Sequence, residues 1–270
     1  MTTITELQAT ITRMQRHLDY VRKLAREKDA EIKQLKSGPP EDKYDAEPCL
    51  IHQDDNLSIY QNDYRDIIDK IKFDCIITDP PYNIGYKYNK YNDKLTEEDY
   101  IKLLKPLKSY KLCMLHHMKP VIKYFCIPNN LSPTDNFVWC YNSNLGRQHR
   151  DLVFFNTKPN KKNVGMPYKN LKDKRIQKMM KEGKQRKMTT FFTDINLVKN
   201  VSKEKVKNFT NQLPIKLYER MIKLISKEGD TILDPFAGTG GLAIACKNLN
   251  RKCILIEQNH IDIIKQRLKL

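Results

Sequence analysis

Residues 231–257 read TILDPFAGTGGLAIACKNLNRKCILIE, and their pattern predicts a strand, a glycine-rich turn, a helix and a second strand. Glycine lets the backbone approach a ligand closely where a helix begins, as in nucleotide-binding folds. The second strand ends at Glu257, about twenty residues beyond the turn, where a carboxylate can accept hydrogen bonds from both hydroxyls of a ribose. The turn alone would be as typical of a plain tight turn, but its spacing from Glu257 favours a site for a nucleoside-bearing cofactor.

The rest of the chain repeats this alternation of short apolar runs and helical patterns. Apolar runs at residues 73–78, 111–116, 136–141 and 152–156 precede those at 231–233 and 252–256. Strands that alternate with helices predict an α/β fold, with a mostly parallel sheet and helices on both of its faces. A chain of 270 residues is long enough to bury a large core of this kind.

A seven-residue repeat of apolar residues occupies residues 4–35, and only Lys28 interrupts its a and d positions. A repeat of this length predicts an α-helical coiled coil over residues 1–37, which associates most simply as a homodimer through residues 4–35. The alternative is a helix that packs on its own domain. The sequence SGPP at 37–40 ends the helix, so we expect a linker at 38–48 and the main domain at 49–270.

The composition is that of a globular and basic chain. Lys+Arg 49 against Asp+Glu 32 gives a formal net charge of +17, with 30% charged and 40% hydrophobic residues. This balance argues against a disordered or membrane-embedded chain and favours an anionic partner, with nucleic acid ahead of an acidic membrane surface. No apolar run reaches the length of a membrane span and no signal peptide is recognisable, so we expect a cytoplasmic protein, or a nuclear one in a eukaryotic host, and no secretion. The seven cysteines form no C-x-x-C pair, so we expect reduced thiols and no bound metal.

A strongly basic segment lies between the predicted strands at 152–156 and 231–233. Residues 158–187 hold twelve Lys or Arg against Asp173 and Glu182, which accounts for ten of the seventeen net charges. We expect an insertion over residues 158–190 that binds nucleic-acid phosphates; the alternative is a solvated loop. The predicted nucleic-acid-binding residues are Lys161, Lys162, Lys169, Lys172, Lys174, Arg175 and Lys178.

The tetrapeptide Asp79-Pro80-Pro81-Tyr82 directly follows the predicted strand at 73–78. An exocyclic amine on a nucleobase is a poor nucleophile because its lone pair is delocalised into the ring. The Asp79 carboxylate and the Pro80 carbonyl, both held at a strand end, can accept the two N–H hydrogen bonds of such an amine. Tyr82 offers a flat face for a base that has left the duplex. The alternative for this motif is an ordinary turn containing two prolines.

Together, the tetrapeptide and the glycine turn resemble the motifs of the DNA amino-methyltransferases, which use S-adenosylmethionine to methylate adenine N6 or cytosine N4. The order of tetrapeptide, basic insertion and glycine turn is similar to the circularly permuted β class of that family. The resemblance covers about residues 57–270. It implies a seven-stranded methyltransferase sheet, S-adenosylmethionine as the cofactor, no metal, and double-stranded DNA with a flipped base as the partner.

The resemblance also implies roles for individual residues. Asp63 matches the acidic residue that receives the adenine amino group of the cofactor, and Gln212 and Pro214 match the motif beside its methionine part. The family usually has Gly and Lys where this chain has Asn62 and Leu213. Residues 139–144 and 149–151 resemble the wall beside the flipped base, with core packing as an equal alternative. The residues assigned to catalysis are Asp79, Pro80, Pro81 and Tyr82, and those assigned to the cofactor are Asp63, Asp234, Phe236, Gly238, Gly240, Glu257, Gln212 and Pro214.

Several target classes remain open at this point. Adenine N6 is preferred to cytosine N4, because in the family Asp at the first motif position accompanies adenine more often and Ser accompanies cytosine. Methylation of cytosine C5 requires a nucleophilic cysteine in a Pro-Cys loop, and the only Pro-Cys pair, at 48–49, lies in the expected linker. The alternatives are an RNA adenine methyltransferase and a degenerate, non-catalytic subunit that recognises DNA or serves as a scaffold.

Overall fold

The computed structural model describes residues 46–86, 91, 93–143, 146–207 and 209–270. They belong to the second of two units into which the chain divides, Asp45–Leu270. The predicted coiled coil at 1–37, the homodimer through residues 4–35 and most of the predicted linker at 38–48 lie outside the described residues.

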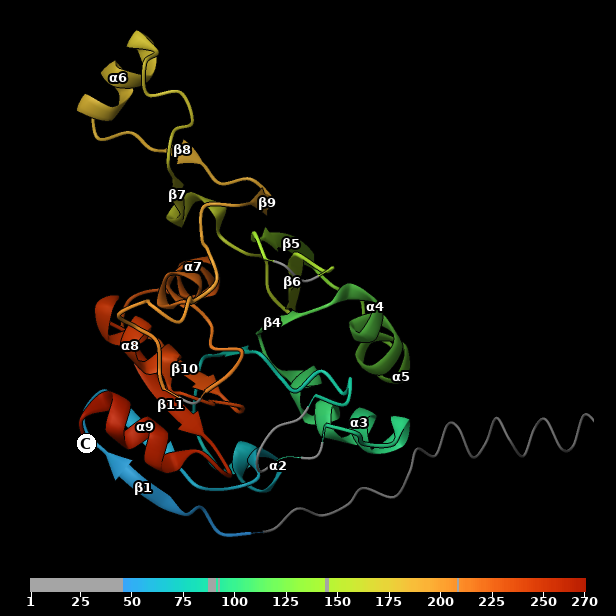
Figure 1. Cartoon of the computed structure of the whole chain (residues 1–270). Coiled ribbons are helices and arrows are strands. Elements are labelled where there is room, and N and C mark those ends of the chain that lie inside the picture. Colours follow the sequence, from blue (N-terminus) through green and yellow to red (C-terminus); the bar gives the residue numbers. More distant parts are fainter. Residues whose placement is uncertain (1–45, 87–90, 92, 144–145, 208) are drawn as a thin grey trace, which may run out of the picture. The chain divides into compact units, whose positions relative to one another are not determined.

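One sheet organises the described part of the chain, with the strand order β1-β2-β11-β10-β3-β4-β6-β5-β9. Figure 1 shows it between two groups of helices. The strands are β1 (Leu50–Gln53), β2 (Leu57–Tyr60), β3 (Cys75–Thr78), β4 (Leu112–His116), β5 (Asp135–Cys140), β6 (His149–Phe155), β9 (Phe191–Phe192), β10 (Thr231–Asp234) and β11 (Lys252–Ile256).

The prediction of a mostly parallel sheet is confirmed. Strands β2, β11, β10, β3 and β4 pair in parallel, whereas β6 lies antiparallel between β4 and β5. All six apolar runs that the sequence predicts as strands are present. The predicted number of seven strands is wrong, because β1 and β9 extend the sheet at its two edges. Both are short and contain exposed residues, so they lack the continuous apolar run that marks the central strands.

Helices cover both faces of the sheet, as the alternating pattern predicts. The helical segments are α2 (Tyr64–Ile67), η1 (Ile68–Lys70), α3 (Glu97–Leu104), η2 (Lys105–Ser109), α4 (Met118–Val121), η3 (Ile122–Cys126), α5 (Ile127–Asn129), η4 (Lys161–Asn163), α6 (Lys174–Lys181), α7 (Ile215–Ile225), α8 (Gly241–Asn248) and α9 (Ile261–Leu268). Two buried clusters fill the space between the layers. The first joins the sheet to α7, α8 and α9, and the second joins it to α2, α3 and α4.

Strand β3 shows how the pleat connects these layers. All four of its residues are buried. Because successive side chains of a strand point to opposite faces, Cys75 and Ile77 enter the cluster with α7 and α8, while Ile76 enters the cluster with α3. A strand buried on both faces has no polar alternation, which explains its continuous apolar sequence.

The parallel strands end along one edge of the sheet, and this places the predicted motifs together. The tetrapeptide follows β3, the glycine turn follows β10, and Glu257 follows β11. Strands β11, β10 and β3 are neighbours in the sheet. In open α/β sheets, ligands bind in the crevice beyond the carboxyl ends of such strands.

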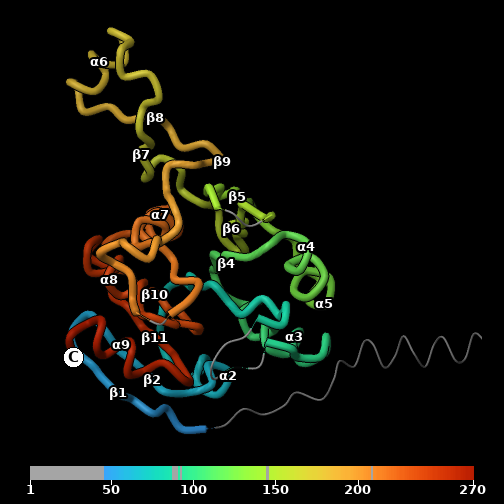
Figure 2. The backbone as a smooth tube through the Cα atoms, in the orientation of Figure 1, coloured from blue at the N-terminus to red at the C-terminus, as the bar shows by residue number. Residues whose placement is uncertain are grey.

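The basic insertion forms an arm between β6 and α7. Its strands β7 (Gly165–Met166) and β8 (Arg186–Lys187) pair antiparallel, and α6 lies between them in the sequence. Figures 1 and 2 show α6 standing away from the sheet. The base of the arm is anchored, since Val164, Met166 and Met188 are buried in the first cluster, whereas α6 buries no residue.

No helix in the described part of the chain is long and apolar enough to cross a membrane. The same residues contain no group of three or more His, Cys, Asp or Glu side chains that could hold a metal ion.

Candidate active site

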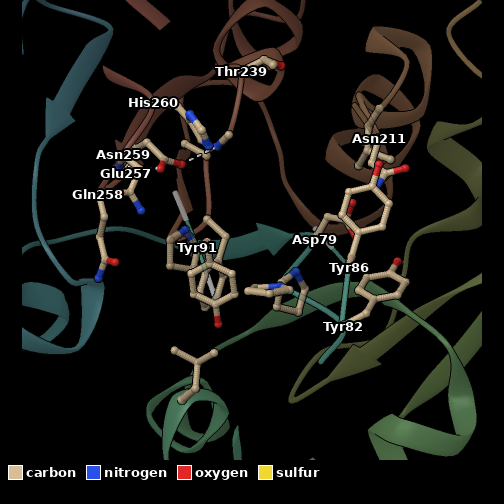
Figure 3. A pocket seen from close by; sticks show the side chains of 18 of the residues that line it. Asp79, Tyr82, Tyr86, Tyr91, Asn211, Thr239, Glu257, Gln258, Asn259 and His260 are labelled. Carbon is tan, nitrogen blue, oxygen red and sulfur yellow. Dashed lines mark hydrogen bonds between the residues drawn. The ribbon is translucent and has the colours of Figure 1, made fainter. Parts of the chain in front are cut away.

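A cavity of about 790 Å³ opens at the carboxyl edge of the parallel strands. Its walls come from the loops after β2, β3, β10 and β11, and from residues 209–213 before α7. Figure 3 shows Glu257 and the three residues after it on one side, and Asp79, Tyr82 and Tyr86 on the other. Of the predicted site residues, those that line this cavity are Asp63, Asp79, Pro80, Pro81, Tyr82, Gln212, Phe236, Gly238 and Glu257.

The glycine turn and Glu257 hold each other at one end of the cavity. Gly238 has a φ of 52°, and its N–H donates to Glu257 Oε2 at 2.8 Å. The other carboxylate oxygen, Oε1, accepts from the Asn259 N–H at 2.9 Å. Each carboxylate oxygen can accept a further hydrogen bond. Glu257 is thus a fixed acceptor on the cavity wall, as a ribose-binding residue requires.

Three predicted cofactor residues lie outside the cavity lining. Asp234 is 1% exposed, and its Oδ1 accepts from Thr78 Oγ1 at 2.9 Å and from the Phe236 N–H at 3.1 Å. It therefore joins the end of β3 to the turn after β10, and burial raises the pKa of its carboxyl to about 7. Gly240 begins α8 with a φ of 70°, and a Cβ there would lie 3.1 Å from Ile264. Pro214 caps the start of α7.

Asp63 and Gln212 border the cavity, but their polar atoms also have protein partners. Asp63 accepts from the Arg65 backbone N–H at 3.0 Å and from its guanidinium at 2.6 and 2.9 Å. Burial raises the pKa of Asp63, yet the bonds from Arg65 outweigh this and leave the pKa below its usual value. Gln212 donates to the Glu204 carbonyl at 2.6 Å and accepts from the Val206 N–H at 2.8 Å, so it shapes the segment that leads to α7.

Asp79 is the central acidic group at the other end of the cavity. Its side chain is 18% exposed, and Oδ2 lies 3.3 Å from Arg150 Nη1. Its second oxygen, Oδ1, is buried and has no hydrogen-bond partner among the described residues. Burial raises the pKa of Asp79, and the nearby positive charge of Arg150 opposes that rise. A carboxylate held by a cation at one oxygen still has acceptor lone pairs without a partner at the other.

The ring of Tyr82 is held by the end of β4. It stacks on His116 with 4.1 Å between ring centroids and 20° between planes. His116 Nδ1 accepts the His117 backbone N–H at 2.7 Å, and burial lowers the pKa of His116 to about 3. The neutral ring therefore carries its hydrogen on Nε2, which faces the Tyr100 hydroxyl at 2.8 Å.

Tyr100 of α3 completes this connection to the tetrapeptide. Its hydroxyl donates to the Pro81 carbonyl at 2.7 Å. The segment after Tyr82 folds around the buried Asp93 carboxylate, which accepts the N–H groups of Asn83 at 2.8 Å, Ile84 at 3.1 Å and Tyr86 at 2.9 Å. The tetrapeptide is thus held from both sides by residues that no local motif indicated.

The predicted wall at 139–144 and 149–151 divides between packing and the site. Trp139 is fully buried, and its indole N–H donates to the Ile195 carbonyl at 2.7 Å. Tyr141 and Arg150 line the cavity instead. Asp151 accepts the Met118 N–H at 2.9 Å. The contact of Arg150 with Asp79 joins residues 71 positions apart, which sequence patterns alone could not place together.

The predicted nucleic-acid-binding side chains are all exposed, and two of them contact acidic residues. Lys161 Nζ lies 3.2 Å from Asp135 Oδ2 and 4.9 Å from the centroid of the Phe137 ring. Arg175 pairs with Asp173, the residue that caps α6, at 3.1 Å. The remaining five, all exposed, are Lys162, Lys169, Lys172, Lys174 and Lys178.

Known proteins share this sequence pattern and this fold. The "DNA methylase" family model matches residues 108–266, more than half of the chain. A type II methyltransferase, M.HpaI of Haemophilus parainfluenzae, is 29% identical over 234 residues, which cover 74% of this chain and 69% of that protein. Another, M.BamHI of Bacillus amyloliquefaciens, is 39% identical over 82 residues, but the match covers only 30% of this chain and 19% of that protein.

Two solved structures share the fold. The M1.HpyAVI–SAM complex has a TM-score of 0.52 and 24% identity, with 79% of this chain and all of that chain covered. The PvuII DNA methyltransferase (cytosine-N4-specific) has a TM-score of 0.54 and 16% identity, with 79% and 85% covered. The motifs gathered at the carboxyl edge, this likeness and the family match agree with one another, and they show that the chain belongs to the N6/N4 DNA methylase family.

Proposed function

We propose that this protein is a site-specific DNA methyltransferase that moves the methyl group of S-adenosylmethionine to the exocyclic amine of a flipped base, which we infer to be adenine N6. One observation carries the proposal: the Asp79 carboxylate and the turn held by Glu257 line the same cavity. Similarity to type II methyltransferases supports a site-specific reaction on DNA.

The residues at the Glu257 end fit the proposed cofactor. Glu257 presents carboxylate oxygens for ribose hydroxyls, and Phe236 and Ala237 supply apolar wall beside the turn. The cavity volume lies within the roughly 300–1,000 Å³ usual for small-ligand sites. S-adenosylmethionine, when bound, supplies a methyl group already activated by its sulfonium sulfur. The protein therefore has to position the acceptor amine and make its lone pair available.

Asp79 and the tetrapeptide backbone perform this second task. A hydrogen bond from the amine to the Asp79 carboxylate, and another to the Pro80 carbonyl, would draw the nitrogen lone pair out of conjugation with the ring. Methylation leaves a cationic nitrogen, which the charge of Asp79 favours until a proton is released. One face of Tyr82 packs on His116 and the Arg150 guanidinium carbon lies 5.4 Å from the ring centroid, so a flipped base would meet a Tyr82 ring that the protein holds in place.

The choice of adenine rests on the aspartate itself. Asp79 occupies the motif position at which the family has Asp more often with adenine N6 and Ser more often with cytosine N4. Duplex DNA is preferred to RNA because the relatives are DNA methylases and the basic arm offers exposed lysines for phosphates.

The test is methyl transfer by the purified full chain. Unmethylated plasmid DNA is incubated with S-adenosylmethionine, digested to nucleosides and analysed by mass spectrometry, with an RNA substrate and the Asp79→Ala variant in parallel. We expect N6-methyladenine in DNA with the wild-type chain only. N4-methylcytosine would overturn the choice of base, and methylated RNA alone would overturn the choice of nucleic acid. Cofactor binding without transfer to either substrate would indicate a non-catalytic subunit.

A further inference from the structure

Arg150 is a cation beside Asp79, and the sequence indicated it only as part of the predicted wall at 149–151. It lies on β6, in the second strand position beyond β3, with a side chain 14% exposed. Nη1 is 3.3 Å from Asp79 Oδ2, and the guanidinium carbon is 5.4 Å from the centroid of the Tyr82 ring. Both tetrapeptide side chains that we assign to the reaction therefore lie against the same arginine.

This contact divides the Asp79 carboxylate into two unequal oxygens. Arg150 occupies Oδ2, whereas the buried Oδ1 has no partner among the described residues. A carboxylate free to rotate would exchange these oxygens, and a base entering the cavity would meet no fixed acceptor. A guanidinium is planar and always charged, so it can hold a carboxylate in one orientation.

The charge of Arg150 also matters, because a protonated carboxyl would donate rather than accept. Burial raises the pKa of Asp79 and so favours the protonated form, which the positive charge of Arg150 counteracts. Other titratable or charged side chains surround Asp79 and Arg150 from several elements. They are Tyr82 of the same loop, Tyr100 of α3, His116 at the end of β4 and His117 after it, Tyr141 after β5, Arg147 before β6, Tyr218 of α7 and Asp234 of β10. Burial raises the pKa of Asp234, and the negative charge of Asp79 adds to that rise.

We propose that Arg150 is a positioning residue for the transfer reaction: it holds the Asp79 carboxylate in one orientation and in its anionic form, so that Asp79 can accept a hydrogen bond from the amine of the flipped base. This role rests on the proposed function. It is distinct from binding a DNA phosphate, which would need a guanidinium exposed at the surface. The matched control is Lys119 of α4, an exposed cation outside the cavity lining.

The experiment compares pH profiles of methyl transfer for the wild type, Arg150→Gln, Arg150→Lys and Lys119→Gln. We expect Arg150→Gln to lower kcat at least tenfold at neutral pH, with little change in the KM for DNA or in cofactor affinity. Loss of the positive charge raises the pKa of Asp79, so the acid limb of kcat/KM should move to higher pH and part of the activity should return there. Arg150→Lys should restore the position of the limb, and Lys119→Gln should leave it unchanged.

Two results would overturn the role of Arg150: an Arg150→Gln variant whose pH profile and kcat match the wild type, or one that loses only affinity for DNA. A second measurement requires no turnover. Asp79→Asn should lower the melting temperature of the wild type, where it breaks an ion pair, but raise that of Arg150→Gln, where it removes a buried carboxyl that lacks its partner. If the effects of Asp79→Asn and Arg150→Gln on the melting temperature were additive, the proposal would be contradicted. Wild-type chain that shows this thermal coupling but transfers no methyl group would instead refute the proposed function and leave the contact intact.

Discussion

At the scale of single residues, Asp79 has the most direct part in the proposed reaction. Asp79→Ala removes an acceptor that acts on the amine as it becomes nucleophilic, so kcat should fall by about 10²–10³, the range found when one such hydrogen bond is removed. Folding and cofactor affinity should persist, because Glu257 and the glycine turn lie at the other end of the cavity. Single-turnover kinetics with titration calorimetry check both statements. Near-normal turnover would remove Asp79 from catalysis.

Glu257 should affect binding rather than transfer. Its carboxylate is the acidic acceptor beside the glycine turn, and hydrogen bonds to charged groups contribute about 1.5–3 kcal/mol. Glu257→Ala should therefore raise the dissociation constant for S-adenosylmethionine by roughly 10-fold to 150-fold. Calorimetry on the DNA-free chain measures this directly, with Asp79→Ala as the control that should bind normally. An unchanged dissociation constant would show that Glu257 does not bind the ribose of S-adenosylmethionine.

At the scale of elements, α3 and β4 support the tetrapeptide through Tyr100. Tyr100→Phe leaves the buried Nε2–H of His116 and the Pro81 carbonyl without their shared partner. Each unsatisfied buried group costs about 1–3 kcal/mol, so the free energy of unfolding should fall by at least this amount. Urea denaturation provides the measurement. The control is Tyr110→Phe, which removes a more exposed hydroxyl contact with Asp69 and should cost less. Equal losses of unfolding free energy in the two variants would show that the buried hydrogen bonds of Tyr100 stabilise the fold no more than the exposed one of Tyr110.

The basic arm is a separate element with a separate role. Four of its exposed lysines, Lys162, Lys169, Lys172 and Lys178, can be changed together to glutamine. The slope of log affinity for DNA against log salt should become shallower by about 0.9 for each phosphate that the arm no longer neutralises. The control removes the same charge on the side of the sheet where the parallel strands begin, and it should alter the slope less. Its four exposed lysines are Lys72, Lys227, Lys247 and Lys252. A slope unaffected by the arm variant would favour the solvated-loop interpretation.

At the scale of the whole molecule, the heptad repeat predicts that two chains associate. Residues 1–37 lie outside the described residues, so the coiled coil and the homodimer stay predictions. Deletion of residues 1–38 should lower the molar mass measured by light scattering and weaken DNA binding more than cofactor binding, because two linked domains raise the effective concentration on DNA. An unchanged molar mass would leave a helix that packs locally or binds another partner.

Signals contained within a short stretch of chain were readable from the sequence. The tetrapeptide, the glycine turn and Glu257 each directly follow an apolar run, and parallel strands end at one edge, so their gathering at a single cavity could be anticipated. Five of the six predicted strands were readable because strands buried on both faces are continuously apolar. The sixth, β5, buries only Phe137 and Trp139, at alternate positions. The short edge strands β1 and β9 were not readable, because their residues are partly exposed.

Contacts between distant positions required the folded chain. Arg150 meets Asp79 across 71 residues, and Thr78 meets Asp234 across 156. No local pattern pairs these residues with one another, because an arginine on a strand and an aspartate after one are common wherever a side chain reaches a charged or polar partner. The direction of a side chain also depends on packing: Asp234, Gly240 and Pro214 belong to the expected motifs, yet they support the cavity without lining it. The sequence could therefore indicate which segments form the site, whereas the packing of β6 beside β4 determines which charge lies beside the Asp79 carboxylate.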